Sequence, residues 1–188
     1  MSEETSTAVI SWEQLLPLAE RFAQDFAQHH HVFATAESCT GGLISGTITA
    51  ISGASQWFDR AFVTYTNEAK MQMLDVQAAT LEAFGAVSVQ TARQMACGAL
   101  SHSSADIAVA VTGIAGPTGG TKDKPVGTVC IAVARRGEDG AYAFCHHFAG
   151  DRMAVRLATV QKALEDLLAL SAGQVPADYE FAIMGNKA

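Results

Sequence analysis

The residues Ala34-Thr35-Ala36-Glu37-Ser38-Cys39-Thr40-Gly41-Gly42 (34–42) decide how this chain folds. Apolar residues at 32–34 predict a strand, which ends abruptly in acid, hydroxyl and thiol side chains followed by two glycines. The glycines allow a tight turn because they lack a Cβ atom, and the pattern after them predicts a helix over 43–51. The hydroxyl and thiol side chains are therefore expected at a helix N-terminus, where free N–H groups and the helix dipole favour an anion.

The same polar cluster also has a purely structural interpretation. Ser and Thr are preferred N-cap residues, so they often precede a helix without any catalytic role. Short polar motifs with glycine also recur by chance. The segment alone leaves a capping role and a catalytic role open, and the rest of the chain has to decide between them.

Length and composition indicate one compact α/β domain. The chain has 188 residues, of which 49% are hydrophobic and 16% charged, with 16 glycines. We expect a single domain over residues 1–172 and a C-terminal tail over 173–188. The net charge of −7 argues against nucleic-acid binding, which needs a basic face. An anionic ligand would have to be held by local contacts.

Targeting and redox features indicate a cytoplasmic protein. Met1–Thr7 is polar and acidic, unlike a signal peptide, and no apolar run is long enough to cross a membrane. The four cysteines, Cys39, Cys97, Cys130 and Cys145, have neither the spacing of a zinc site nor that of a disulfide framework. We therefore expect reduced thiols and no metal.

Hydrophobic periodicity predicts alternating helices and strands. Helices are expected over 15–29, 43–51, 68–74, 78–84, 89–101 and 153–172, and strands over 31–36, 57–66, 106–111, 126–135 and 141–148. The turn at 136–140 predicts a hairpin between the last two strands. This order predicts a three-layer α/β/α sandwich with a mixed, mostly parallel sheet.

Polar clusters follow three of the predicted strands. They are Glu37–Thr40, Tyr65–Asn67 together with Lys70, and Thr112–Gly113 with the glycine-rich loop behind it. In open α/β sheets, ligands bind in the crevice beyond the carboxyl ends of the strands. The three clusters are therefore expected to form one site.

The clusters contain the groups needed for nucleophilic catalysis. A serine such as Ser38 needs a base, and the histidines are poorly placed, so the better partner is Lys70, whose amine can lose its charge when it is desolvated. Tyr65 could relay the proton, and Glu37, Asn67 or both could orient the site. Cys39 is a rival nucleophile, because a helix N-terminus lowers the pKa of a thiol. Tyr65 and Lys70 also have a plain alternative as solvated surface side chains.

Two further features could bind a phosphate group. The backbone N–H groups of Thr112–Gly113 and the following glycines could hold its oxygens, although the spacing matches no standard phosphate-binding motif. Arg152, at the start of the last helix, could pair with the same group, or it could be an ordinary surface arginine.

Four separate motifs carry a resemblance to a known family. They are residues 36–42 (AESCTGG), 63–70 (VTYTNEAK), 111–117 (VTGIAGP) and 125–129 (PVGTV). In this order they resemble the CinA C-terminal family, and the resemblance extends from about residue 15 to residue 170. Thr66 stands where serine is expected in the family, and it keeps the hydroxyl group.

The resemblance implies an activity and a set of site residues. The enzymatic members are nicotinamide-nucleotide amidases, which hydrolyse nicotinamide mononucleotide to nicotinate mononucleotide and ammonia. By similarity, Ser38, Tyr65 and Lys70 are expected to be catalytic, and no cofactor is needed. The candidate substrate-binding residues are Glu37, Thr40, Gly41, Gly42, Asn67, Thr112, Gly113 and Arg152.

The resemblance also bears on partners and on the alternative. Some relatives carry an additional N-terminal hydrolase domain, which this chain is too short to contain, so a stand-alone amidase is expected. The expected partner is the small-molecule substrate, with neither nucleic acid nor membrane, and a homodimer is expected. The alternative is a catalytically silent nucleotide-binding or competence-associated partner protein.

Overall fold

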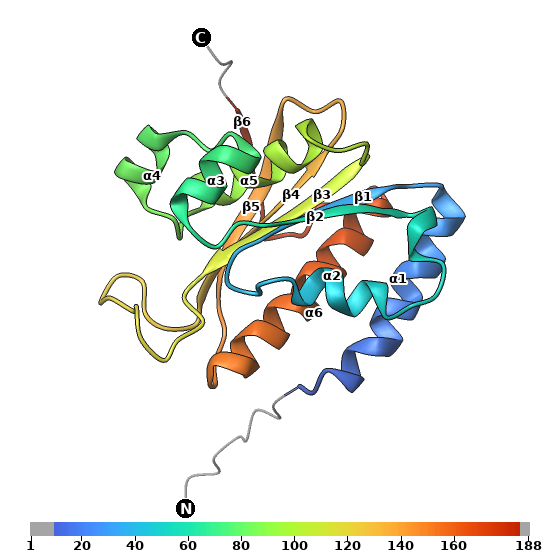
Figure 1. The fold of residues 1–188 in the computed structure, drawn as a ribbon, viewed down its shortest axis with the longest axis horizontal. Helices are drawn as coiled ribbons and strands as arrows, with labels where there is room; N and C mark the ends of the chain where they lie inside the picture. Colours follow the sequence, from blue (N-terminus) through green and yellow to red (C-terminus); the bar gives the residue numbers. More distant parts are fainter. Residues whose placement is uncertain (1–9, 185–188) are drawn as a thin grey trace, which may run out of the picture.

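The fold is a six-stranded sheet between two layers of helices (Figure 1). The computed structural model describes residues 10–184, so Met1–Thr7 lies outside the described part. The strands are β1 (Phe33–Glu37), β2 (Phe58–Val63), β3 (Ile107–Gly113), β4 (Thr128–Arg135), β5 (Gly140–His147) and β6 (Glu180–Ile183). The helices are α1 (Leu16–His29), α2 (Leu43–Thr49), α3 (Asn67–Leu74), α4 (Ala78–Phe84), α5 (Val89–Ser101) and α6 (Arg152–Ser171), with short 3₁₀ turns at Glu13–Leu15 and Ala54–Gln56.

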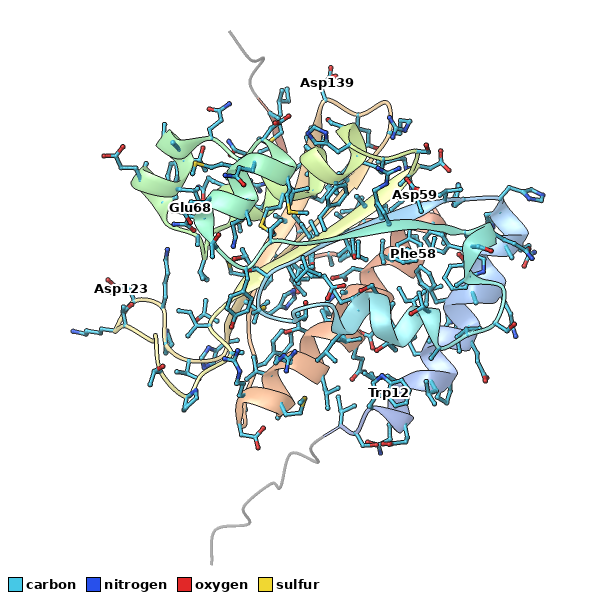
Figure 2. The ribbon with its side chains drawn as sticks, in the orientation of Figure 1. Trp12, Phe58, Asp59, Glu68, Asp123 and Asp139 are labelled. Atoms are coloured by element: carbon cyan, nitrogen blue, oxygen red, sulfur yellow. A yellow bond between two sulfur atoms is a disulfide. The ribbon has the colours of Figure 1, made fainter. Side chains whose placement is uncertain are left out.

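Two hydrophobic cores separate the three layers. Helices α1, α2 and α6 cover one face, and α3, α4 and α5 lie on the other (Figure 1). Large side chains fill the first core, with an aromatic cluster of Phe22, Phe26, Phe33 and Trp57. Phe58, labelled in Figure 2, packs against Phe33 of this cluster. The second core is rich in alanine, which lets α5 approach the sheet closely. The predicted α/β/α sandwich is confirmed.

The sheet is mixed, but parallel pairing is confined to one side of it. Strands β2, β1 and β3 are parallel to one another. The pairs β3–β4, β4–β5 and β5–β6 are antiparallel. The expectation of a mostly parallel sheet therefore needs correction, because the predicted hairpin and an unpredicted sixth strand together add antiparallel pairs.

The segment after α6, predicted to be a tail with little pattern, returns to the sheet. Its four residues Glu180–Ile183 pair with β5 as β6. The tail is anchored by the Tyr179 hydroxyl, which donates to the buried carboxylate of Asp166 and lies 3.2 Å from His146 Nε2. A strand this short gives almost no periodic signal, which is why the sequence pattern did not reveal it.

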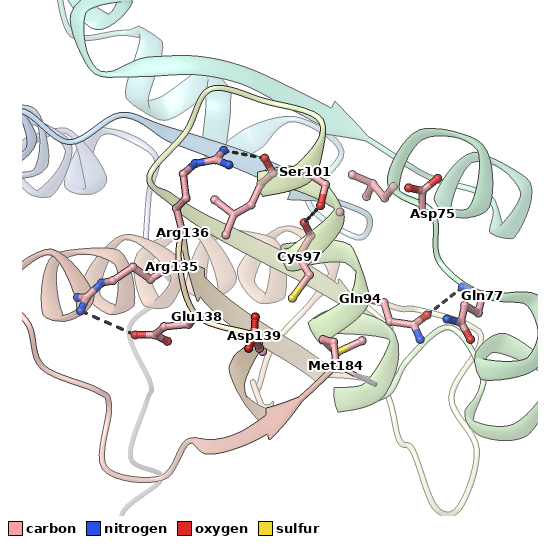
Figure 3. A pocket seen from close by; sticks show the side chains of 15 residues that line it. Asp75, Gln77, Gln94, Cys97, Ser101, Arg135, Arg136, Glu138, Asp139 and Met184 are labelled. Atoms are coloured by element: carbon pink, nitrogen blue, oxygen red, sulfur yellow. Dashed lines mark hydrogen bonds and ion pairs between the residues drawn. The ribbon is translucent and has the colours of Figure 1, made fainter. Parts of the chain in front are cut away.

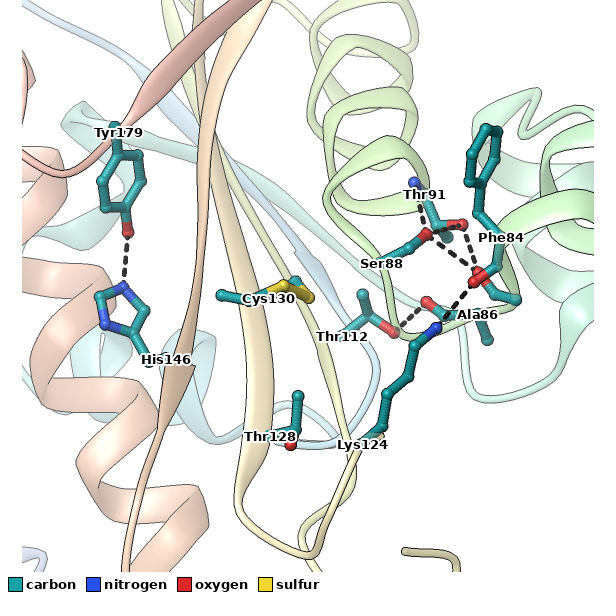
Figure 4. The surroundings of a disulfide bond; sticks show 12 residues. Phe84, Ala86, Ser88, Thr91, Thr112, Lys124, Thr128, Cys130, His146 and Tyr179 are labelled. Atoms are coloured by element: carbon teal, nitrogen blue, oxygen red, sulfur yellow. Dashed lines mark hydrogen bonds between the residues drawn. A yellow bond between two sulfur atoms is a disulfide. The ribbon is translucent and has the colours of Figure 1, made fainter. Parts of the chain in front are cut away.

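Cys130 and Cys145 form a disulfide across β4 and β5 (Figure 4). This corrects the expectation that all thiols are reduced; Cys39 and Cys97 remain free. The two residues stand directly opposite each other in the register, with Thr112 beside Cys130 on β3. Since the two cysteines lie at nearly equal distances on either side of the predicted 136–140 turn, the hairpin register was the signal that could have found the pair.

No helix within residues 10–184 combines the length and the apolar character required to cross a bilayer. Within the same range, no cluster of three or more His, Cys, Asp or Glu side chains is arranged to hold a metal ion.

Candidate active site

The three predicted polar clusters meet at the carboxyl ends of β1, β2 and β3. They enclose a cavity of about 210 Å³. Helix α6 closes the cavity from the side through Arg152. The residues that line it are Ser38, Cys39, Tyr65, Asn67, Lys70, Ala86, Val87, Thr112, Gly113, Ala115 and Arg152. The expected site is therefore a real cavity, and the loop at 86–87 is a wall that sequence reasoning missed.

Ser38 and Lys70 form a buried pair at the bottom of this cavity. Lys70 Nζ lies 3.0 Å from Ser38 Oγ and donates to the Thr64 carbonyl oxygen at 2.9 Å. The lysine is 1% exposed, and burial lowers the pKa of its amine because the charged form is desolvated. A neutral Nζ can keep its bond to Thr64 and accept the serine proton. The geometry thus suits Lys70 as a base for Ser38.

Tyr65 is placed differently from the expected proton relay. Its side chain is 61% exposed, and its hydroxyl accepts a hydrogen bond from Arg152 Nη2 at 2.9 Å. Arg152 also donates to the Gly116 carbonyl at 2.7 Å, so it connects the β2–α3 loop with the glycine-rich loop. Within the described residues, no hydrogen bond joins Tyr65 to Ser38 or Lys70. Direct proton transfer between Lys70 and Ser38 is therefore the shorter route.

Glu37 is a structural anchor below the nucleophile. It is fully buried, and its carboxylate accepts bonds from the hydroxyls of Thr35 and Thr40 and from three backbone N–H groups at the start of α2: Gly42, Ile44 and Ser45. Neither Glu37 nor Thr40 lines the cavity. The two residues fix the turn, which fits the orienting role expected of Glu37, and the substrate contact expected of both stays a prediction.

Several backbone N–H groups of the Ser38–Gly42 turn already donate hydrogen bonds within the chain. Ser38 N donates to the Val111 carbonyl at 3.0 Å, and Gly41 N donates to the Ser38 carbonyl at 3.1 Å. Gly42 N is taken by Glu37, and neither glycine lines the cavity. The N–H groups of Cys39 and Thr40 are therefore the donors of this turn that remain for an oxyanion.

Cys39 lacks the properties of a reactive thiol. It is buried, and burial raises its pKa to about 12, although the N–H groups of Cys39 and Thr40 and the charge of Arg156 partly oppose this shift. The expected lowering of the thiol pKa at the helix N-terminus is wrong here, because desolvation is the larger effect. Ser38, whose hydroxyl contacts the amine of Lys70, therefore remains the stronger candidate.

The residues expected to hold a phosphate line the same cavity and form another part of its wall. Thr112 and Gly113 end β3, and the Thr112 hydroxyl donates to the Ala86 carbonyl at 2.8 Å. Asn67 begins α3 at the mouth of the same cavity. Arg152 brings a positive charge to this wall, which gives the acidic chain a local site for an anion.

A larger cavity, of about 360 Å³, lies at the opposite end of β4, around the β4–β5 turn (Figure 3). Its arginine Arg136 already donates to the carbonyls of Leu100, Ser103 and Ala105. Gln94 likewise bonds to Gln77 N and to the Thr80 hydroxyl. Both of these polar side chains therefore already have hydrogen-bond partners within the described chain.

Comparison with known proteins shows the family of this chain. Residues 15–171 match the model of the CinA C-terminal domain. The chain belongs to the CinA C-terminal domain family. A nicotinamide-nucleotide amidohydrolase PncC of Escherichia coli (strain K12) is 48% identical over 155 residues, which are 82% of this chain and 93% of that protein. A CinA-like protein of Chlorobium limicola is 50% identical over 127 residues, 68% of this chain, but these span only 30% of that longer protein.

A solved structure shows the same family fold. The competence/damage inducible protein CihA from Agrobacterium tumefaciens is 53% identical and superposes with a TM-score of 0.78, covering 83% of this chain and 94% of that one. The matched range includes every helix from α2 to α6 and the strands β1 to β5, so the whole cavity lies inside the family domain.

Proposed function

We propose that this chain is an amidohydrolase that converts nicotinamide mononucleotide to nicotinate mononucleotide and ammonia, as a step of pyridine nucleotide salvage. The observation that carries the proposal is the buried pair of Ser38 Oγ and Lys70 Nζ, 3.0 Å apart, at the end of the cavity. The substrate class follows from family relatives that are named nicotinamide-nucleotide amidohydrolases. We place the reaction in the cytoplasm and expect a homodimer.

In the proposed reaction, Ser38 Oγ attacks the carboxamide carbon while its proton passes to Lys70. The resulting oxyanion is stabilised by N–H groups of the nucleophile turn, a contribution of about 3–4 kcal/mol per donor in comparable sites. Lys70 then returns the proton to the amide nitrogen, the carbon–nitrogen bond breaks, and ammonia leaves. A water molecule, deprotonated by Lys70, hydrolyses the acyl-serine and regenerates Ser38.

The other residues of the cavity hold the nucleotide in this proposal. The phosphate lies against Arg152 and the Thr112–Gly113 wall of the cavity, where the Ile114 N–H is already taken by the Thr128 carbonyl at 2.8 Å, and Asn67 contacts another part of the substrate. Tyr65 orients Arg152 through its hydroxyl, in addition to the catalytic role expected from the family resemblance. No cofactor takes part in these steps.

Two substitutions test the nucleophile. Ser38→Ala should abolish ammonia release from nicotinamide mononucleotide, a loss of at least about a thousandfold, because the attacking oxygen is gone. Cys39→Ala should keep most of the activity, since its thiol is buried and protonated. Both are measured by a coupled ammonia assay with circular dichroism as a control for folding.

The outcomes separate the alternatives. Turnover that survives in Ser38→Ala would remove the serine from the reaction, and loss only in Cys39→Ala would transfer the role to the thiol. A wild-type chain that binds nicotinamide mononucleotide in calorimetry but releases no ammonia would favour the silent nucleotide-binding protein instead.

A further inference from the structure

Arg156 contacts the Ser38–Gly42 turn, which carries the proposed nucleophile, from outside the cavity. It lies on α6 one turn after Arg152, and it does not line the cavity. Its Nη2 donates to the backbone carbonyl of Thr40 at 2.6 Å. The same nitrogen stands 3.5 Å from the position that a Cβ atom on Gly41 would take. The guanidinium is therefore packed directly on the turn that follows Ser38.

Thr40 connects this turn by hydrogen bonds to the groups around it. Its carbonyl also accepts the N–H of Leu43 at 3.3 Å, the first contact that leads into α2. On the strand side, the Thr40 hydroxyl donates to Glu37 at 2.7 Å. One residue of the turn is thus held by a buried carboxylate through its side chain and by a guanidinium through its backbone.

The hydrogen bonding and charge of Arg156 argue against a role limited to filling space in the core. Its Nε is buried without a hydrogen-bond partner in the described chain, which is unfavourable for stability. An apolar side chain would cover α2 without this penalty. Its positive charge also reaches the turn, because it is one of the groups that oppose the raised pKa of Cys39. The contact with Thr40 is what the arginine provides and an apolar residue would not.

We propose that Arg156 is a positioning residue for the nucleophile: its bond to the Thr40 carbonyl holds the Ser38–Gly41 turn in the orientation that attack requires. The inference rests on the proposed function. The orientation of Ser38 Oγ and of the Cys39 and Thr40 N–H groups depends on the same short turn. Small displacements of such groups have large effects, since a misplacement of about 1 Å can cost roughly a hundredfold in rate.

Kinetics of three variants test the proposal. Arg156→Ala should lower kcat about ten- to a hundredfold while KM for nicotinamide mononucleotide changes less than about threefold, because the arginine does not touch the substrate. The kcat of Arg156→Lys should lie between those of the wild type and Arg156→Ala. The lysine ammonium keeps the positive charge but lacks the planar arrangement of donors of a guanidinium. Arg136→Ala is the matched control: that arginine also donates to backbone carbonyls, but far from the cavity.

A chemical rescue separates positioning from stability. Adding guanidinium at non-denaturing concentration to Arg156→Ala should restore activity several-fold with saturation, and it should not change Arg136→Ala. A loss of kcat that follows the unfolded fraction in both variants, or an unchanged kcat in Arg156→Ala, would overturn the proposal. So would an effect confined to KM.

A serine-directed probe makes the test independent of the substrate. A fluorophosphonate should label Ser38 in the wild type, and the labelling rate should fall in Arg156→Ala by a factor similar to the fall in kcat. If the wild type is labelled but releases no ammonia, the proposed function fails while the labelling rates still decide the role of Arg156. Equal labelling rates in wild type and Arg156→Ala would refute it.

Discussion

Lys70 shows how one residue brings function and stability into conflict. An amine with 1% exposure has lost most of its hydration, and its hydrogen-bond partners among residues 10–184 are the Thr64 carbonyl and the Ser38 hydroxyl. The environment therefore favours the neutral form, which lowers its pKa. A base needs this property, and a protein selected only for stability would place an apolar side chain here.

We predict that the wild type and Lys70→Met will differ in how their stability and their activity depend on pH. Between the lowered folded pKa and the usual value of 10.5, the unfolded chain binds more protons at Lys70 than the folded one. The free energy of unfolding of the wild type, relative to Lys70→Met, should therefore rise with pH through that window. The activity of the wild type should rise with pH as the amine becomes neutral. Lys70→Met should lose this activity.

Urea unfolding at a series of pH values and kcat/KM profiles measure both effects. All other titrating groups are shared by the two proteins, so they cancel in the difference. A stability difference that is constant with pH, or a near-normal rate in Lys70→Met, would show that Lys70 is not the base.

At the scale of elements, the sequence predicted what depends on local pattern. The bounds of α4 (Ala78–Phe84) and α5 (Val89–Ser101) were predicted to the residue, because the glycine after α4 and the serine before α5 are local signals. The strand-end clusters were also predicted to meet, which follows from sheet topology. For Glu37 the sequence left two roles, orienting the site and contacting the substrate, since a motif does not show whether a carboxylate faces a cavity or the backbone of the next helix.

The features that were missed depend on contacts between distant segments. The strand β6 exists because β5 offers an unpaired edge, and Arg156 reaches Thr40 across 116 positions in the chain. Desolvation of Cys39 is likewise a product of packing. None of these has a periodic or compositional signal within its own segment.

The contact between α3 and α5 gives a prediction at this scale. A Cβ atom on Gly98 of α5 would stand 2.1 Å from the Leu74 carbonyl oxygen of α3, so Gly98→Ala must push the two helices apart. The cost should be about 1–3 kcal/mol in the free energy of unfolding. Because α3 carries Lys70, kcat should fall as well.

Gly46→Ala on α2 is the matched control. A Cβ atom there meets nothing within 4 Å, so alanine should stabilise the helix by about 0.5–1 kcal/mol. Denaturant unfolding and ammonia release are measured for both variants. A Gly98→Ala protein as stable and active as the wild type would show that α3 is free to shift without moving its lysine.

At the scale of the whole molecule, the charge distribution bears on substrate choice. The chain carries a net charge of −7, so its overall field repels an anionic nucleotide. Binding must then depend on a local cation, and Arg152 supplies one at the cavity wall. Its guanidinium bonds to the Tyr65 hydroxyl and the Gly116 carbonyl, which fix its direction before any ligand arrives.

We predict that Arg152→Ala will separate nicotinamide mononucleotide from its unphosphorylated riboside. A charge-assisted hydrogen bond to phosphate contributes roughly 1.5–3 kcal/mol, so KM for the mononucleotide should rise about ten- to a hundredfold. The riboside and free nicotinamide, which lack the phosphate, should already be poor substrates of the wild type and should change little. Steady-state kinetics with the three compounds decide the question, and an equal loss for mononucleotide and riboside would mean that Arg152 supports the cavity wall without reading the phosphate.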